Sequence, residues 1–202
     1  MNVYYIGGSP CSGKSTAAGA LAETYGLAYF KADDYLEEFT ARGAAAGLPV
    51  CREIQRMTAE ETWMRPPRAQ CREELDYYRE VFPFVMEKLA ALSAPCILAE
   101  GAAFLPDLMQ AHGIGADRYI AIVPSRDFQF SRYRQRPWVS HVLQDCTDPD
   151  AAFVNWMERD ALFALEIRRR CEAAGYLCLL TDGSVSPEKQ LARIAAHFHL
   201  NI

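Results

Sequence analysis

The stretch Gly8-Ser9-Pro10-Cys11-Ser12-Gly13-Lys14-Ser15 decides the fold of this chain, because it matches the pattern G-x-x-x-x-G-K-[ST] at every position. Glycine lets backbone N–H groups turn inward around phosphate oxygens, the lysine adds a mobile positive charge, and the serine offers a hydroxyl to Mg²⁺. We therefore predict that a nucleoside triphosphate binds along Gly8 to Thr16, through Gly8, Ser9, Pro10, Cys11, Ser12, Gly13, Lys14, Ser15 and Thr16.

The sequence on either side of this stretch supports the same interpretation. An apolar run, Val3 to Ile6, precedes it, and a helical pattern with Ala17, Leu21 and Tyr25 on one face follows. A chance match would occur in roughly one chain in a hundred of this length, given glycine near ~7% of residues. The order strand, loop, helix makes chance the weaker explanation, because the helix N-terminus then points its partial positive charge at the phosphates.

The rest of the chain alternates short apolar runs with helical patterns. Apolar runs lie at residues 27–30, 96–99, 119–123 and 176–180, and helical patterns at about 71–92, at 151–174 and from Ser186 onward. This alternation predicts an α/β, three-layer P-loop NTPase fold, in which helices cover both faces of a five-stranded parallel sheet. We expect residues 1–202 to form a single domain, and Pro83 to kink or split the helix over 71–92.

The amino-acid composition disfavours several classes of binding partner. The net charge of −5 over 202 residues argues against broad nucleic-acid or anionic-membrane binding. No apolar run reaches the ~18 residues of a membrane span, and the N-terminus leads directly into a strand pattern. The seven cysteines are scattered, which suggests neither a zinc site nor a disulfide framework. We expect a cytoplasmic protein whose partner is a small molecule, with no nucleic acid and no membrane.

Two carboxylates follow predicted strands, at the sheet edge where ligands bind. Asp33, in Lys31-Ala32-Asp33-Asp34, is expected to orient an acceptor hydroxyl or take its proton. The alternative, that an aspartate here only caps the next helix, is weaker for Asp33 and preferred for Asp34. Glu100 lies where a Walker-B acid would sit beside the metal, although most such sites use aspartate. Ser15 and Glu100 are the predicted Mg²⁺ site, with Glu100 contacting either a Mg²⁺-bound water or a substrate hydroxyl.

Arginines gather in two segments. Residues 125–150 are expected to form a lid containing Arg126, Arg132, Arg134 and Arg136; Arg132 and Arg136 share a helical face and are the predicted catalytic pair. One or two of the four would then belong to a solvated helix face. Residues 41–95 are expected to form the acceptor-binding insert, in which arginines suit a carboxylate or phosphate. Its candidates are Arg52, Arg56, Trp63, Arg65 and Arg68. Thr181-Asp182-Gly183 either meets the nucleotide base or is a plain turn.

Taken together, these motifs resemble the P-loop small-molecule kinases, which include shikimate, gluconate and chloramphenicol kinases and the nucleoside monophosphate kinases. The resemblance rests on Gly8 to Thr16, Asp33, Glu100-Gly101 and the segment from Arg126 to Arg136. Where shikimate- and gluconate-type members carry Asp-x-Asp after the second strand, this chain reads Lys31-Ala32-Asp33, so the first acid is replaced by lysine.

The resemblance implies an ATP- and Mg²⁺-dependent enzyme that transfers the γ-phosphate to a hydroxyl or phosphate of a small metabolite. Lys14, Asp33, Arg132 and Arg136 would be its catalytic residues. The alternative is a regulatory or hydrolytic nucleotide-binding module. The chain contains no Asn-Lys-x-Asp run to read guanine and is short for an added output domain, which disfavours that alternative.

Overall fold

The computed structural model describes residues 2–200, and within them five parallel strands form one sheet in the order β2-β3-β1-β4-β5. The strands are β1 (Asn2–Gly8), β2 (Ala28–Lys31), β3 (Cys96–Glu100), β4 (Tyr119–Pro124) and β5 (Leu177–Thr181). The five predicted apolar runs therefore all become strands. Since β1 lies at the centre, its carboxyl end is flanked by the ends of β3 and β4.

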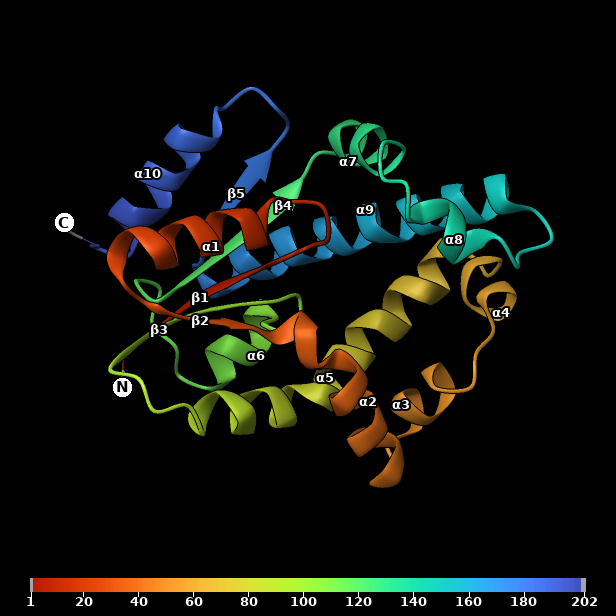
Figure 1. The fold of residues 1–202 in the computed structure, drawn as a ribbon, viewed down its shortest axis with the longest axis horizontal. Helices are drawn as coiled ribbons and strands as arrows, with labels where there is room; N and C mark the ends of the chain where they lie inside the picture. Colours follow the sequence, from red (N-terminus) through yellow and green to blue (C-terminus); the bar gives the residue numbers. More distant parts are fainter. Residues whose placement is uncertain (1, 201–202) are drawn as a thin grey trace.

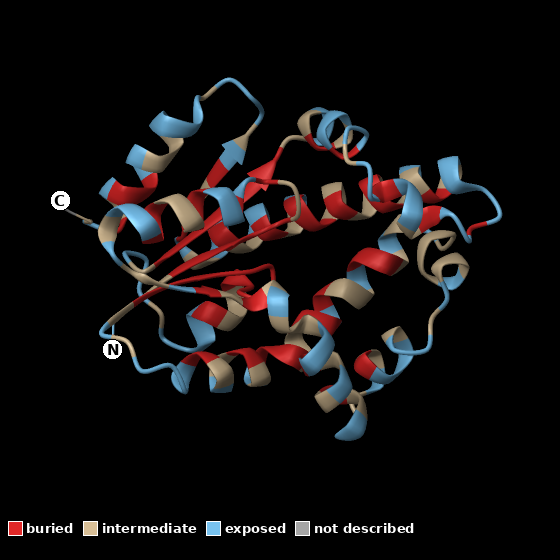
Figure 2. Cartoon of the chain, in the orientation of Figure 1, coloured by how far each residue is buried: buried red, intermediate tan, exposed pale blue. Residues whose placement is uncertain are grey.

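Helices cover both faces of the sheet, as Figure 1 shows, which confirms the three-layer α/β prediction. The helical segments are α1 (Lys14–Tyr25), the 3₁₀ turn η1 (Ala32–Tyr35), α2 (Leu36–Ala45), α3 (Pro49–Ile54), α4 (Ala59–Trp63), α5 (Pro67–Ala90), α6 (Pro106–Ala111), α7 (Arg126–Tyr133), α8 (Val139–Leu143), α9 (Pro149–Ala174) and α10 (Pro187–His197). On one face, α1 and α10 pack against the sheet through residues such as Leu21 and Ile194. On the other face, α5, α6 and α9 bury a larger apolar core, drawn in red in Figure 2.

The long helix α5 departs from its prediction in two ways. It begins at Pro67, four residues before the expected start, because proline is well tolerated in the first helical turn. It also continues through Pro83 without being split. Figure 1 shows α5 changing direction along its length, which confirms the expected kink. Apolar residues on both sides of Pro83, among them Val81 and Val85, are buried, and this packing keeps the helix in one piece.

The second long helix, α9, begins two residues before its predicted start. Asp148 occupies the N-cap position, and its carboxylate accepts a 3.0 Å hydrogen bond from the backbone N–H of Ala151. The helix ends at Gly175, which adopts the left-handed conformation (φ 72°) that is common for a glycine at a helix C-terminus. The helix is therefore fixed at both ends, and it carries the functional side chains described below.

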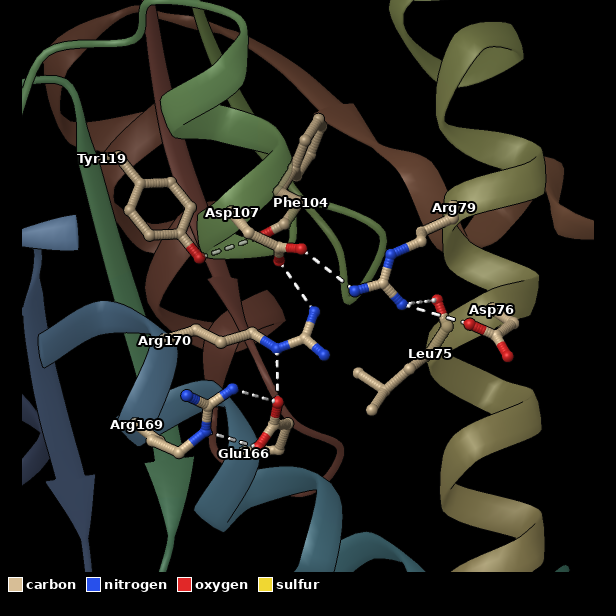
Figure 3. A network of polar contacts seen from close by, with 9 residues as sticks. All are labelled: Leu75, Asp76, Arg79, Phe104, Asp107, Tyr119, Glu166, Arg169 and Arg170. Atoms are coloured by element: carbon tan, nitrogen blue, oxygen red, sulfur yellow. Dashed lines mark hydrogen bonds and ion pairs between the residues drawn. The ribbon is translucent and has the colours of Figure 1, made fainter. Parts of the chain in front are cut away.

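An ion-pair network ties three helices together beneath the sheet (Figure 3). Asp107 on α6 accepts a 2.8 Å hydrogen bond from Arg170 of α9 and a 3.0 Å bond from Arg79 of α5. Burial alone would raise the pKa of Asp107, but the two guanidinium groups outweigh it and hold the pKa below its usual range. This network therefore links α5, α6 and α9 on one face of the sheet.

Candidate active site

The loop between β1 and α1 has the backbone shape that its glycines predict. Gly8 has a φ of 121°, and a Cβ there would lie 1.9 Å from the carbonyl oxygen of Ile122 on the neighbouring strand. Gly13 has a φ of 85° and precedes the first residue of α1. Cys11 also has positive φ, 61°, which is uncommon for a residue other than glycine. The loop is thus held in a tight turn that ends at a helix N-terminus, as an anion site requires.

Polar groups gather inside this loop. Lys14 is only 5% exposed, and its ammonium donates a 2.8 Å hydrogen bond to the carbonyl of Ser9. The hydroxyls of Ser9 and Ser12 are buried and find no hydrogen-bond partner among residues 2–200. The hydroxyl of Thr181, at the end of β5, donates to the Ser12 carbonyl at 2.9 Å and anchors the far side of the loop. Unpaired buried hydroxyls are costly, so the loop is suited to a polar ligand such as phosphate.

Glu100 ends β3 beside the loop and is fully buried. The hydroxyl of Tyr29 donates to its Oε1 at 3.0 Å, while its Oε2 has no hydrogen-bond partner within the described part of the chain. Burial raises the pKa of the Glu100 carboxyl, and the Lys14 charge and the Ser15 and Tyr29 hydroxyls oppose that rise.

The residues present fit a magnesium ion. A free carboxylate oxygen and a nearby serine hydroxyl are hard oxygen ligands of the kind Mg²⁺ prefers. Residues 2–200 contain no group of three His, Cys, Asp or Glu side chains that could enclose a metal ion. The remaining ligands would therefore be phosphate oxygens and water, as is usual for Mg²⁺ at phosphoryl-transfer sites.

Asp33 lies in η1, directly after the edge strand β2, and packs against the end of β3. A Cβ on Gly101 would lie 2.7 Å from the Cβ of Ala32 and 3.3 Å from Oδ1 of Asp33. Glycine at position 101 therefore allows the Asp33 segment to approach Glu100. The charge of Asp33 contributes to the raised pKa of Glu100, as expected for neighbouring carboxylates.

The expectation that Asp34 caps the following helix is wrong. Its carboxylate instead pairs with Lys31 at 2.7 Å on the surface, and the N-cap position of α2 is occupied by Tyr35 without a side-chain cap. The reason is the 3₁₀ turn η1, which keeps Asp34 inside a helical turn and not at the start of one. Asp33 and Asp34 are adjacent but face different surroundings.

Arg132 and Arg136 both line a cavity of about 510 Å³ that opens beside the phosphate loop. The guanidinium of Arg136 donates to the Cys11 sulfur at 3.6 Å. Arg126 and Arg134 lie elsewhere: Arg126 pairs with Glu158 of α9 and covers Phe130, and Arg134 covers Phe153. The structure therefore separates the four arginines into two at the cavity and two on the outside of α7.

The opposite wall of the same cavity comes from the β5–α10 loop and α10. Thr181, Gly183 and Leu191 line it, whereas Asp182 bonds locally to Ser184. The amide of Gln190 donates to the Thr181 hydroxyl at 3.2 Å. Apolar walls with a few polar groups suit a nucleotide base, which is one of the two alternatives raised for Thr181-Asp182-Gly183.

In the insert, the expected arginines are exposed or already paired. Arg52, Arg56 and Arg68 are exposed. Arg65 forms a two-pronged ion pair with Glu73, at 2.8 and 2.6 Å. Trp63 stacks on Trp156 of α9, with ring centroids 4.4 Å apart.

Sequence reasoning missed a charged group beside this stack: Glu74 on α5 and the adjacent Arg159 and Asp160 on α9. Arg159 lies 2.9 Å from Glu74 and 2.6 Å from Asp160, and Asp160 is fully buried. Burial raises the pKa of Asp160, and the charges of Arg159 and, more weakly, of Lys14 oppose that rise. One signal was available, because Asp160 interrupts the apolar stripe that includes Trp156, Phe163 and Ile167.

Comparison with known proteins supports the fold. No model of a known protein family matches the chain, and no curated protein sequence matches it. Solved structures do match over nearly their whole length. Shikimate kinase from Bacteroides thetaiotaomicron has 18% identity and a TM-score of 0.54, with 98% of this chain and 99% of that one covered.

Two further structures give the same result. TT1252 from Thermus thermophilus has 17% identity and a TM-score of 0.54, covering 100% and 98% of the two chains. Shikimate kinase from Acinetobacter baumannii in complex with shikimate has 18% identity and a TM-score of 0.50, covering 98% and 92%. The chain therefore has the fold of the P-loop small-molecule kinases, as the sequence motifs predicted.

Proposed function

We propose that this protein is an ATP-dependent phosphotransferase that moves the γ-phosphate to a hydroxyl or phosphate of a small metabolite. The observation that carries the proposal is the convergence of three groups from neighbouring strand ends. Glu100, the last residue of β3, lies in register with Ile6 of β1 and with Lys31 of β2, and its pKa responds to the charges of Lys14 and Asp33, which follow those two strands. A phosphate-binding loop, a metal-type carboxylate and a second carboxylate thus lie together, which is the donor set of a phosphoryl-transfer site.

The chain's own residues account for each requirement of the transfer to a hydroxyl. The loop N–H groups and Lys14 hold the β- and γ-phosphates, and Asp33 orients the hydroxyl of the acceptor. The bond from the γ-phosphorus to the bridging oxygen breaks, a bond to the acceptor oxygen forms, and ADP leaves with the bridging oxygen. The hydroxyl proton passes to Asp33 and then to water.

Charge that develops on the transferred group is balanced by Lys14 and by the two cavity arginines, Arg132 and Arg136. Mg²⁺, held by Ser15 and by Glu100 directly or through water, would neutralise phosphate charge.

Residues 41–95 would bind the acceptor and residues 125–150 would close over the nucleotide. We also propose the cytoplasm as the location of the protein. Among residues 2–200, no helix is long and apolar enough to cross a membrane.

The test compares Asp33→Asn with Asp34→Asn, its neighbour on the surface. ATP consumption is measured against a panel of hydroxylated and phosphorylated metabolites, and ATP binding is measured by calorimetry. We expect Asp33→Asn to lose about 10²- to 10⁴-fold in acceptor-dependent turnover while it keeps ATP binding. Asp34→Asn should remain close to wild type. Acceptor-independent hydrolysis that is insensitive to Asp33 would instead indicate the hydrolytic or regulatory alternative.

A further inference from the structure

A second cavity, of about 170 Å³, lies within the insert between α4, α5 and α9. Gln70, Glu73, Glu74 and Tyr78 line it from α5, and Arg159 lines it from α9. With about 30 Å³ as the liquid volume of one water, it has room for a compound about the size of one small ring.

This cavity adjoins the proposed transfer site. The charge of Asp33 raises the pKa of both Glu74 and Tyr78 on the cavity wall. On the other side, Asp160 pairs with Arg159 of the cavity wall and responds to the charge of Lys14 in the phosphate loop. Tyr77, which also lines the cavity, donates a 3.4 Å hydrogen bond to the carbonyl of Leu36, three residues after Asp33, so the cavity wall is tied to the segment that carries Asp33.

The cavity offers no spare positive charge. Both prongs of the Arg65 guanidinium are engaged by Glu73. Arg159 is shared between Glu74 and Asp160, whose side chains are 11% and 0% exposed. Three carboxylates thus accompany two guanidinium groups, and the surplus is negative whenever Glu74, whose pKa burial raises to about 7, is ionised. An anionic ligand would have to break one of these pairs in a poorly hydrated site, which is expensive.

The cavity also presents hydrogen-bond acceptors that lack donors. Gln70 is 4% exposed, and its amide nitrogen donates to the carbonyls of Trp63 and Arg65, which fixes the orientation of the amide. Its Oε1 has no partner within residues 2–200. Glu74 Oε2, although close to Arg159, likewise receives no hydrogen bond from any described residue. Unsatisfied acceptors beside surplus negative charge are suited to an N–H donor that carries positive charge.

The cavity can also bind an uncharged hydroxyl group. The Nε of Arg65 is buried and makes no hydrogen bond to any part of the chain that the structure describes, whereas the Nε of Arg159 lies 2.6 Å from Oδ1 of Asp160. The charge of the Arg65 guanidinium is already balanced by Glu73, so its Nε can donate to an uncharged hydroxyl oxygen. The cavity therefore combines a site for a hydroxyl group with a site for a cation.

We propose that the acceptor of this kinase is a small polyhydroxylated compound that carries a protonated amino group, and that Glu74 and Gln70 bind its ammonium. This inference rests on the proposed function and names the substrate class of that site. It replaces the expectation that arginines of the insert bind an acidic acceptor. Of the arginines expected to do so, Arg65 lines this cavity, and its charge is already balanced by Glu73.

The test uses matched compounds and the full chain loaded with Mg²⁺ and a non-hydrolysable ATP analogue. Calorimetry compares glucosamine with glucose, and 2-deoxystreptamine with scyllo-inositol, with shikimate as the carboxylate. In wild type we expect an aminated member to bind about tenfold or more tightly than its hydroxylated partner, since a hydrogen bond to a charged group contributes about 1.5–3 kcal/mol. Glu74→Gln should remove that preference and leave the hydroxylated member unchanged. Glu74→Asp should keep it, and Asp76→Asn, an exposed control on the same helix, should have no effect.

A second measurement uses only wild type and covers the case in which Glu74→Gln does not fold. Burial raises the pKa of Glu74 to about 7, opposed by Arg159 and reinforced by Asp160 and Asp33. Binding of an ammonium requires the ionised carboxylate, so it should release a proton and weaken as the pH falls below 7. Binding of the hydroxylated partner should not show this dependence.

Each result has a defined meaning. Equal or tighter binding of glucose, scyllo-inositol or shikimate would overturn the inference, and so would failure of both aminated compounds to bind. If the ATP analogue binds and, in a separate assay with ATP, a neutral or acidic acceptor is phosphorylated in preference to the aminated compounds, the inference fails while the kinase function stands. If no acceptor accelerates ATP consumption and hydrolysis is insensitive to Asp33, the proposed function itself fails.

Discussion

The hydroxyl of Tyr29 donates a 3.0 Å hydrogen bond to the Oε1 of Glu100 across the neighbouring strands β2 and β3. This bond helps hold a fully buried carboxyl group in its charged form, against a burial effect that raises its pKa. Tyr29 itself is 41% exposed, so the bond connects the surface of the edge strand with the proposed magnesium site.

Replacing Tyr29 with phenylalanine should therefore weaken the use of Mg²⁺ at acidic pH. The pKa of Glu100 would rise further, and a protonated carboxyl cannot serve the metal. We expect the acid limb of kcat/KM to move to higher pH and the apparent Mg²⁺ affinity near pH 6 to fall about three- to tenfold. The measurement is the turnover rate as a function of Mg²⁺ concentration, at about pH 6 and at about pH 8. Tyr25→Phe is the control, and an equal loss at both pH values would contradict the prediction.

A second prediction concerns the contact between Gly101 and the Asp33 segment. Gly101→Ala would place a methyl group 2.7 Å from the Cβ of Ala32, so η1 must move away from β3. We expect a loss of about 1–3 kcal/mol in the free energy of unfolding and a fall in kcat with little change in nucleotide affinity. Urea denaturation and calorimetry with ATP separate the two effects. Gly19→Ala in α1 is the matched control, since a Cβ there meets no described atom within 4 Å and should stabilise the helix.

The strand ends could be predicted from the sequence because parallel α/β sheets collect ligand-binding residues at one edge. That rule places Ser15, Asp33 and Glu100 near one another without knowledge of any contact. This rule does not predict which side chains on different helices form pairs. The Arg65–Glu73 pair joins the segment before α5 to α5 itself, and the Glu74–Arg159 pair joins α5 to α9, much further along the chain. A sequence pattern therefore identifies arginines in the insert but not which charges remain available to a ligand.

Similar reasoning applies to the lid. Helical spacing grouped Arg132 with Arg136, and both line the cavity beside the phosphate loop, but α7 ends at Tyr133, so Arg136 lies in the following turn and not on a shared helical face. It could not assign Arg126 to Glu158, because that partner lies 32 residues further along the chain.

The division of the four arginines leads to a third prediction. Arg136→Ala or Arg132→Ala should lower kcat about 10²- to 10³-fold, by the loss of a cation beside the transferred phosphate. Arg134→Ala removes an equal charge from the same segment, but this side chain covers Phe153 on the outside. It should stay within about twofold of wild type, because surface charges contribute little. Steady-state kinetics at saturating ATP distinguish the variants. Equal losses in Arg134→Ala and Arg136→Ala would show that the lid acts only through its net charge.

The last prediction concerns Glu74 and the pH dependence of stability without any ligand. Burial raises the pKa of Glu74 from an ordinary value of 4.5 to about 7 in the folded protein. Between these values the folded state binds more protons than the unfolded state, so this group's contribution to stability falls as the pH rises through the window. Glu74→Gln stays neutral at every pH. The stability of Glu74→Gln relative to wild type should therefore improve by about 1–3 kcal/mol between about pH 5 and about pH 8.

Urea denaturation at several pH values measures the difference, with Asp76→Asn as the exposed control on the same helix. A constant difference would mean that Arg159 keeps Glu74 ionised throughout, and that the surplus negative charge of the cavity is present even at acidic pH.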